Sequence, residues 1–255
     1  LNNMKLSIII PSFNQSAYIE ETIKCTLEIK EKSKHHGCEI EVLLFDSESE
    51  EEVQTIISKY KEQLDFVEVK KDKGQYDAIN KGIEHCKGDY WTWLNTDDTL
   101  DIEGFFKLVD YLKHNPTVDY IYGGIDYIDE KSNHLRTFES YEISEKMLIT
   151  RVPGIFQQGS FFRTEFTNKI GLLKNYNCCF DYEYVLRCLR NHAKMHVCKF
   201  KVANFRQHSV SKTGSLTPVF IREQLIISKE YGRKPLNFLT WFSQLRLIKH
   251  KLFPK

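Results

Sequence analysis

Short apolar segments alternate with amphipathic segments over the first hundred residues of the chain. The apolar segments are bounded by polar or turn-forming residues, as buried strands of a parallel sheet are. The amphipathic segments carry apolar residues three or four positions apart, which places them on one face of a helix. The predicted order is strand 6–11, helix 16–34, strand 41–45, helix 51–60, strand 66–69, helix 75–86 and strand 90–94. This alternation predicts an α/β fold in which helices cover both faces of a parallel sheet.

The pattern changes in the second half of the chain. Two strand-like segments, 120–127 and 135–138, flank the polar run Asp129–Asn133 and predict a hairpin. Further strands are predicted at 158–163 and 195–202, and further helices at 180–191, 218–231 and 236–252. We expect these elements to complete the sheet and to form the second wall of a cleft.

Composition narrows the class of protein. A hydrophobic content of 41% and an aromatic content of 13% over 255 residues support a sizeable core and exclude a disordered chain. Trp91 and Trp93 share a parity in their strand, so we expect both rings to pack in that core. The longest apolar run is far short of the ~18 residues of a membrane span. No charged segment followed by an apolar one opens the chain, so we expect no signal peptide.

Charge and cysteine content bear on partners and location. The net charge is +1, so the overall balance does not indicate a nucleic-acid partner. The distribution is uneven, because residues 222–255 contain eight Lys or Arg against two Glu. The seven cysteines include no CxxC pair and no zinc-finger spacing, which favours a reduced, cytoplasmic setting.

Polar residues follow three of the predicted strands. They are Ser12–Asn14 after the first strand, Asp46–Ser49 after the second and Asn95–Asp98 after the fourth. Each suits a simple turn, but parallel strands end at one edge of a sheet, so the three together favour a site in a crevice. The first turn has neither a GxGxxG nor a P-loop motif, so a bound nucleotide would need another phosphate contact. The oxygen ligands of Asn95–Asp98 suit Mg²⁺ or Mn²⁺.

Six segments together resemble the inverting family 2 glycosyltransferases of the GT-A fold. The most specific is DKGQYDAINKGIEHCKGDYWTWLNTDD at 72–98, and the others lie at 7–15, 41–51, 157–163, 180–187 and 206–214. They resemble in particular the subgroup found in bacterial O-antigen, capsule and exopolysaccharide gene clusters. The resemblance implies a mixed, mostly parallel central sheet flanked by helices, in a GT-A catalytic domain of residues 4–217. Its nucleotide-binding half would span residues 4–98 and its acceptor half residues 99–217, with 218–255 as a basic helical appendage.

The resemblance assigns a set of residues to the nucleotide: Pro11, Phe13, Asn14, Asp46, Lys73, Thr96 and Lys212. Phe13 would stack on the base, and Asp46 would hydrogen-bond it, most often as uracil. An N-cap of helix 51–60 is a second role for Asp46 and is compatible with the first. Lys73 would approach the base or the ribose, with a solvated loop lysine as the alternative. Lys212 would contact the diphosphate.

The resemblance also implies a divalent metal ion, Mn²⁺ or Mg²⁺. Asn95–Asp97 matches the DxD motif of the family with Asn in its first position, which makes Asp97 the chief metal carboxylate. His208 matches a histidine that joins the metal or the β-phosphate in relatives, with a structural role as its alternative. Contacts with the donor sugar or the acceptor are expected from Asp98, Gln157, Gln158 and Tyr182.

Asp181 is the expected general base. It stands near the start of helix 180–191, where FDYE matches the motif that holds the base in the family. An inverting transferase uses one carboxylate to take the proton of the acceptor hydroxyl in a single displacement, and a helix N-terminus favours the ionised form. Phe180 and Glu183 depart from the acidic positions of that motif, so Glu183 is the reserve candidate. The alternative for Asp181 is a helix N-cap.

The expected function is transfer of a sugar, from a UDP-sugar in the first instance, to an acceptor hydroxyl of a bacterial surface glycan. In relatives such acceptors are carried on a polyprenyl diphosphate. The alternatives are a nucleotidyltransferase, which the lack of a glycine-rich basic loop at 12–17 disfavours, and a non-catalytic nucleotide-sugar-binding module.

The predicted helix 236–252 combines an aromatic apolar stripe with basic residues. This composition fits peripheral binding to the inner leaflet of the cytoplasmic membrane. Packing on the catalytic domain, or on a second copy in a homodimer, is the alternative.

Overall fold

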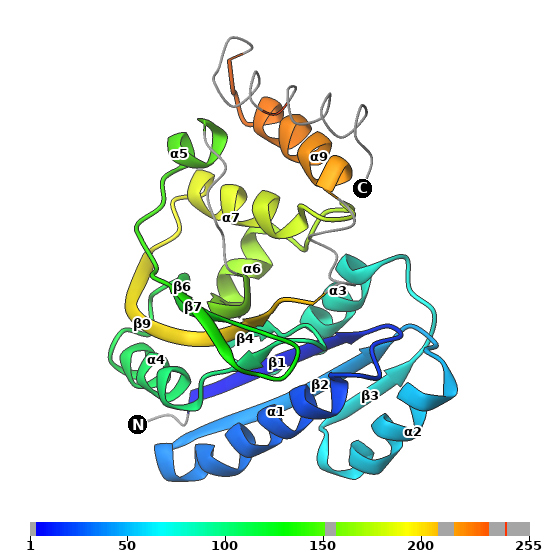
Figure 1. Ribbon diagram of the computed structural model, residues 1–255. Helices are drawn as coiled ribbons and strands as arrows, with labels where there is room; N and C mark the ends of the chain where they lie inside the picture. The colour runs from blue at the N-terminus through cyan, green and yellow to red at the C-terminus, as the bar shows by residue number, and fades with distance from the viewer. Residues whose placement is uncertain (1–3, 151–156, 209–216, 235–242, 244–255) are drawn as a thin grey trace.

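The computed structural model of the chain describes residues 4–150, 157–208, 217–234 and residue 243 (Figure 1). Its described strands form one sheet. Its first half follows the predicted alternation. The elements are β1 (Met4–Ser12), α1 (Ile19–Ser33), β2 (Cys38–Asp46), α2 (Glu51–Tyr60), β3 (Phe66–Val69), α3 (Gln75–His85) and β4 (Tyr90–Trp93). These four strands run parallel in the spatial order β3-β2-β1-β4. The α/β prediction for this half is confirmed.

The second half extends the same sheet with mixed pairing. The elements are β5 (Thr99–Leu100), α4 (Ile102–His114), β6 (Tyr120–Ile128), β7 (His134–Phe138), α5 (Glu145–Thr150), β8 (Ser160–Arg163), α6 (Thr164–Ile170), α7 (Phe180–Arg190), β9 (Met195–Arg206) and α9 (Thr217–Glu230). The predicted hairpin is the antiparallel pair β6–β7. Antiparallel pairing of β4 with β8 joins the two halves, and the full described order is β3-β2-β1-β4-β8-β6-β9-β5. Strand β9 continues four residues beyond the predicted strand end, to Arg206.

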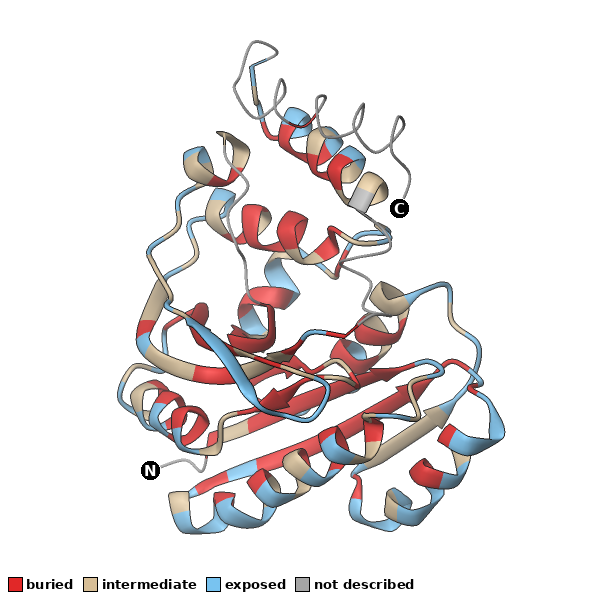
Figure 2. Ribbon diagram, in the orientation of Figure 1, coloured by how far each residue is buried: buried red, intermediate tan, exposed pale blue. Residues whose placement is uncertain are grey.

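Apolar side chains cover both faces of the sheet, and the central strands are buried along most of their length (Figure 2). Side chains of a strand alternate between faces, so Ile8 and Ile10 of β1 pack with α1, α2 and α4, whereas Ile9 packs with α3, α6 and α7. Trp91 and Trp93 of β4 are buried in this second cluster with stacked rings, which confirms that they share a face and belong to the core. Deleting one such buried side chain to Ala typically costs about 2–5 kcal/mol.

Helix α9 lies along α7, at the end of the molecule away from α1 and α2 (Figure 1). Ile227 of α9 and Tyr231, just after it, are buried in the second cluster. The predicted helix 236–252 lies outside the described residues, except for Ser243. None of the described helices is long and apolar enough to cross a bilayer.

Candidate active site

The ends of β1 and β2 are tied together by hydrogen bonds. Ser12 and Asp46 are paired in register, and the Ser12 hydroxyl donates to Asp46 Oδ1 at 2.7 Å. Asn14 adopts a left-handed conformation with φ 47°, which Asn tolerates better than most residues. Its backbone N–H donates to Ser49 Oγ and its Oδ1 accepts from the Glu50 N–H, both at 2.9 Å. Two of the three predicted polar clusters therefore meet at one edge of the sheet.

Asp46 is buried and accepts four hydrogen bonds. Its oxygens take the hydroxyls of Ser12 and Ser49, the Ser49 N–H and the side-chain amide of Gln54. The helix it was expected to cap begins after Glu50, with no side-chain cap, so the N-cap role is wrong. Two donors on each oxygen fill the ordinary capacity of a carboxylate. A nucleobase would therefore have to replace one of these donors.

Phe13 projects from the same edge and is 63% exposed. Val69, the register partner of Asp46 on β3, is also exposed. Pro11 is buried within β1, and Lys73 is exposed in the loop before α3. An exposed aromatic ring beside a polar strand edge is suited to stacking on a flat ligand.

Asp98 stabilises the loop after β4 from within. It is fully buried and accepts from Gln158 Nε2 at 2.9 Å, from the Arg206 N–H at 3.0 Å and from Asn95 Nδ2 at 3.1 Å. Burial, followed by the charge of neighbouring Asp97, raises the pKa of Asp98 well above its usual range. The Asp98 side chain is therefore occupied by protein donors.

The two glutamines also hold this loop in place. Gln157 donates to the backbone carbonyl of Trp93 and accepts from Asn95, and Gln158 donates to Asp98. Both glutamines are buried, as is Thr96. In this structure Gln157 and Gln158 shape the loop around Asp97.

Asp97 and His208 come together from opposite halves of the chain. Asp97 Oδ2 lies 2.9 Å from His208 Nε2, and the two side chains are 18% and 1% exposed. His208 Nδ1 is buried and has no hydrogen-bond partner among the described residues. The described ranges contain no group of three or more His, Cys, Asp or Glu arranged to hold a metal ion. The site therefore brings one carboxylate and one imidazole within hydrogen-bond distance of each other. Lys212 lies outside the described residues.

Arg206 is buried beside this pair, and its role was not anticipated from the sequence. Its Nε donates to the Asp97 carbonyl, Nη1 to the Asp129 carbonyl and the Ser132 hydroxyl, and Nη2 to Glu21. Its guanidinium also lies over the Tyr18 ring, 4.7 Å from the centroid. Arg206 thus joins α1, the β6–β7 hairpin and the loop after β4. Its two-residue separation from His208 was the available sequence signal.

Asp181 lies in the first turn of α7 and is half-buried. Burial raises its pKa to about 6, while the Tyr182 N–H, which donates to Asp181 Oδ1 at 2.7 Å, acts in the opposite direction. The residue at the N-cap of α7 is Cys179, so the N-cap alternative for Asp181 is wrong. A carboxylate with this pKa is mostly ionised at neutral pH and is more basic than an ordinary Asp.

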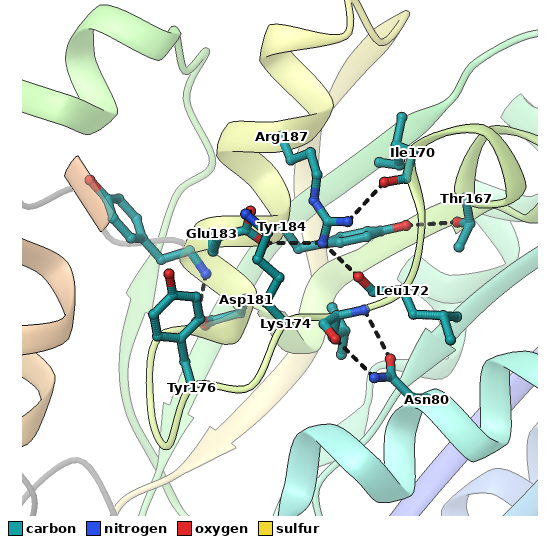
Figure 3. A network of polar contacts seen from close by, with 12 residues as sticks. Asn80, Thr167, Ile170, Leu172, Lys174, Tyr176, Asp181, Glu183, Tyr184 and Arg187 are labelled. Carbon is teal, nitrogen blue, oxygen red and sulfur yellow. Dashed lines mark hydrogen bonds and ion pairs between the residues drawn. The ribbon is translucent and has the colours of Figure 1, made fainter. Parts of the chain in front are cut away.

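Glu183 and Tyr182 are both buried, and Glu183 belongs to the network of polar contacts drawn in Figure 3. Glu183 is fully buried, within 2.9 Å of Lys174 Nζ and 3.0 Å of Arg187 Nη2, and it accepts from the Tyr231 hydroxyl at 2.8 Å. Tyr182 is 4% exposed, and its hydroxyl donates to the Leu148 carbonyl. Glu183 therefore belongs to an ionic network, and the Tyr182 ring is covered.

The fold of the chain is similar to that of glycosyltransferases of known structure. Among solved structures, the chain resembles residues 1–349 of TarS from S. aureus in complex with UDP-GlcNAc, with a TM-score of 0.65, 17% identity and coverage of 98% of this chain and 73% of that one. It also resembles the mannosyltransferase PcManGT from Pyrobaculum calidifontis in complex with GDP-Man and Mn²⁺, with a TM-score of 0.62, 12% identity and coverage of 99% and 76%. These likenesses establish the GT-A fold.

Sequence relatives are similar over half of the chain. An uncharacterized glycosyltransferase from Rickettsia felis is 32% identical over 134 residues, 51% of this chain and 21% of the relative. A poly-β-1,6-N-acetyl-D-glucosamine synthase from Staphylococcus aureus is 26% identical over 139 residues, 54% of this chain and 32% of the relative. The matches therefore cover less than half the length of these relatives. The model of glycosyl transferase family 2 matches residues 7–180, more than half of the chain, and the chain belongs to that family.

Proposed function

We propose that this chain is an inverting, metal-dependent glycosyltransferase that moves a sugar from a UDP-sugar to an acceptor hydroxyl. The observation that carries the proposal is the Asp97–His208 pair, in which a carboxylate and an imidazole meet at the carboxyl edge of a parallel sheet. Ligands of open α/β sheets bind at this edge. Membership of glycosyl transferase family 2 supports the reaction class.

Asp97 and His208 are the residues that would hold Mn²⁺ or Mg²⁺. Carboxylate oxygen and imidazole nitrogen both suit these ions. The buried Nδ1 of His208 has no hydrogen-bond partner among the described residues, which fits a ring that exchanges partners for a ligand. The ion, when bound, would neutralise charge on the leaving diphosphate. Lys212 stays a proposal for the diphosphate contact.

Asp181 would take the proton of the acceptor hydroxyl. Its pKa of about 6 suits this task, because the carboxylate is mostly ionised at pH 7 yet binds a proton better than an exposed Asp. A single displacement with the acceptor on the face opposite the nucleotide inverts the anomeric carbon. Glu183 is the weaker candidate, since three donors surround its carboxylate.

The nucleotide would bind across the ends of β1 and β2. Phe13 would stack on the base, and Asp46 and Asn14 would form the adjoining wall. Lys73 and Thr96 complete the proposed contacts. The UDP class is supported by the UDP-GlcNAc complex of the TarS structure, although the PcManGT structure holds GDP-Man.

The acceptor would be a bacterial surface glycan of the O-antigen or capsule type, carried on a polyprenyl diphosphate. The named activity of the staphylococcal relative, poly-β-1,6-N-acetyl-D-glucosamine synthase, supports a polysaccharide context. The proposed location is the cytoplasm, with peripheral contact at the inner leaflet through residues 236–252. The proposed division is a catalytic domain of residues 4–217 followed by the basic segment 218–255.

A thermal-shift screen tests the donor class directly. UDP-, GDP- and dTDP-sugars are compared with and without Mn²⁺, because a ligand that binds the native state raises its melting temperature. We expect the largest shift with a UDP-sugar and Mn²⁺ together, and slow release of UDP in the same mixture. A shift with GDP-sugars alone would reassign the donor. No shift with any nucleotide-sugar would overturn the proposal.

A further inference from the structure

Glu223 of α9 accepts hydrogen bonds from three consecutive backbone N–H groups at the entrance to α7. Its Oε1 lies 2.7 Å from the N of Asn177, and its Oε2 lies 2.9 Å from the N of Cys178 and 3.0 Å from the N of Cys179. The first N–H groups of a helix have no partner within it, and Cys179, the N-cap of α7, provides no side-chain cap. Glu223 thus satisfies the N–H of the N-cap residue Cys179 and those of the two loop residues before it, so a carboxylate from another helix fixes the entrance to α7.

The same helix also holds α7 further along. The Tyr231 hydroxyl, just beyond α9, donates to Glu183 at 2.8 Å, and Arg190 in the last turn of α7 donates to the Tyr231 carbonyl at 2.8 Å. The Arg190 guanidinium also lies over the Tyr231 ring, 4.3 Å from its centroid. The α7 helix is thus attached to α9 at its start and at its end, and Asp181 lies between the attachment points.

Glu223 is also an electrostatic neighbour of Asp181. Among the described residues, it is the charged group whose field raises the pKa of Asp181, after the larger effect of burial. The titratable neighbours from other elements are Tyr120 of β6 and Cys179 of the preceding loop. Burial raises the pKa of both, so they stay neutral. A substitution that removes the charge of Glu223 therefore changes the electrostatic surroundings of Asp181.

We propose that Glu223 is the positioning residue for the general base: it fixes residues 177–179 and thereby the orientation of Asp181 at the start of α7. The inference rests on the proposed role of Asp181. It assigns a function in the reaction to α9, which lies beyond the residues matched by the family model. Glu223 itself touches neither donor nor acceptor in this proposal.

Two substitutions separate position from charge. Glu223→Ala removes the acceptor for all three N–H groups, and kcat should fall by about tenfold or more, the scale of one misplaced catalytic group. The KM for the donor should stay within about twofold, since the proposed nucleotide contacts lie around the ends of β1, β2 and β4 and before α3, outside α7 and α9. Glu223→Gln keeps the size of the side chain and removes its charge. It should lower kcat less and move the acid limb of the kcat–pH profile to lower pH by about half a unit, the scale of one partly screened charge.

Glu230→Gln is the matched control. Glu230 is an exposed residue of the same helix that accepts from the Tyr176 hydroxyl at 3.3 Å. The backbone N–H groups of residues 177–179 donate to Glu223 instead. This variant should keep the kcat, the KM and the acid limb of the unchanged protein. Circular dichroism and melting curves establish that each variant is folded. If Glu223→Ala is unfolded, the kcat and the acid limb of Glu223→Gln decide whether Glu223 acts on Asp181.

Asp181→Asn separates failure of this inference from failure of the proposed function. If Asp181→Asn keeps full activity, the base assignment fails, whatever Glu223 does. If Asp181→Asn is inactive while Glu223→Gln has the kcat and acid limb of the unchanged protein, the positioning role of Glu223 is overturned. Equal losses in kcat and in donor affinity for the Glu223 variants would indicate general loosening of the fold and would overturn it as well.

Discussion

The guanidinium of Arg206 donates from Nε to the backbone carbonyl of Asp97, 2.9 Å away. Its backbone N–H donates to the side chain of Asp98, so β9 is attached to the loop after β4 at two points. His208 follows two residues later. The distance between Asp97 and His208, the two proposed metal ligands, is therefore set by the backbone on both sides.

Replacing Arg206 should damage both stability and metal binding. Arg206→Met removes four side-chain hydrogen bonds from a buried site, and we expect a loss of about 2–4 kcal/mol in the free energy of unfolding. Urea denaturation measures this loss. Titration calorimetry of the folded variant with Mn²⁺ and UDP should give a weaker affinity. Arg136→Met is the control, because Arg136 is exposed and lies over the Tyr127 ring of the hairpin. An unchanged Mn²⁺ affinity in Arg206→Met would contradict the positioning argument.

Removing the Asp97 carboxylate should abolish metal-dependent binding. Asp97→Ala should show no detectable sugar transfer and a weaker Mn²⁺-dependent affinity for UDP, because one of the two proposed protein ligands is gone. Calorimetry with and without Mn²⁺ reads this out independently of activity. Asp110→Asn, at an exposed position of α4, is the control and should behave as the unchanged protein. Full activity in excess chelator would refute the metal requirement.

Asp181→Asn should remove the base while leaving donor binding intact. General-base catalysis contributes about 10²–10⁴-fold, so kcat should fall by that factor with UDP affinity near that of the unchanged protein. In the unchanged protein, kcat should rise through pH 6 and level off above it, because the ionised form is the active one. If Glu183→Gln is inactive and well folded while Asp181→Asn is active, the two assignments must be exchanged.

Asp181 also predicts a pH-dependent stability. Its folded pKa of about 6 lies above the unfolded value of about 3.9, so the folded state binds the extra proton. Stability is then lost as the pH rises from about 4 to 6, and the full cost remains above that range. Asp181→Asn should therefore be more stable by about 1–3 kcal/mol at pH 7.5, with the difference vanishing near pH 4. Denaturation curves at the two pH values measure it, and a less stable variant at pH 7.5 would contradict the sign.

Phe13→Ala should weaken nucleotide binding without destabilising the fold. Base–aromatic stacking contributes about 1–3 kcal/mol, which corresponds to a loss of roughly 5- to 150-fold in UDP affinity. The Phe13 side chain is 63% exposed, so the melting temperature should stay nearly constant. Leu135→Ala, another exposed apolar residue on β7, is the control for both measurements. Unchanged UDP affinity in Phe13→Ala would remove this residue from the nucleotide site.

The period of the hydrophobic pattern predicted most of the helices and strands. The first strands and helices were predictable because each has a pure period in its hydrophobic pattern, and α2 and β3 occupy the predicted residues. Helix α4 is not among the predicted elements, although Asp101 caps it and its apolar face is buried. The short strand β5 has too few residues to show a period, and its pairing with β9 is a tertiary contact.

The parts of the site that could be predicted from the sequence are those that lie directly after a strand. The polar clusters after β1, β2 and β4 follow from parallel topology, and the Asp97–His208 pairing came from the family resemblance. The network of Arg206 and the contact of Glu223 with residues 177–179 could not be read from the sequence, because each joins residues far apart along the chain. The four hydrogen bonds to Asp46 and the charged side chains around Glu183 could not be predicted either, because they depend on which buried polar groups pair in the folded chain.

The contact between Glu223 and residues 177–179 would also order events during synthesis on the ribosome. Residues 177–179 leave the exit tunnel some forty residues before Glu223, so their amides are first bonded to water or to transient partners. Long-range contacts of this kind form late in folding, because the intervening chain must be closed into a loop. The nascent chain could thus form the parallel strands β1–β4 while α7, which carries Asp181, is not yet fixed at its start. The proposed base, Asp181, would then reach its final orientation only when α9 docks.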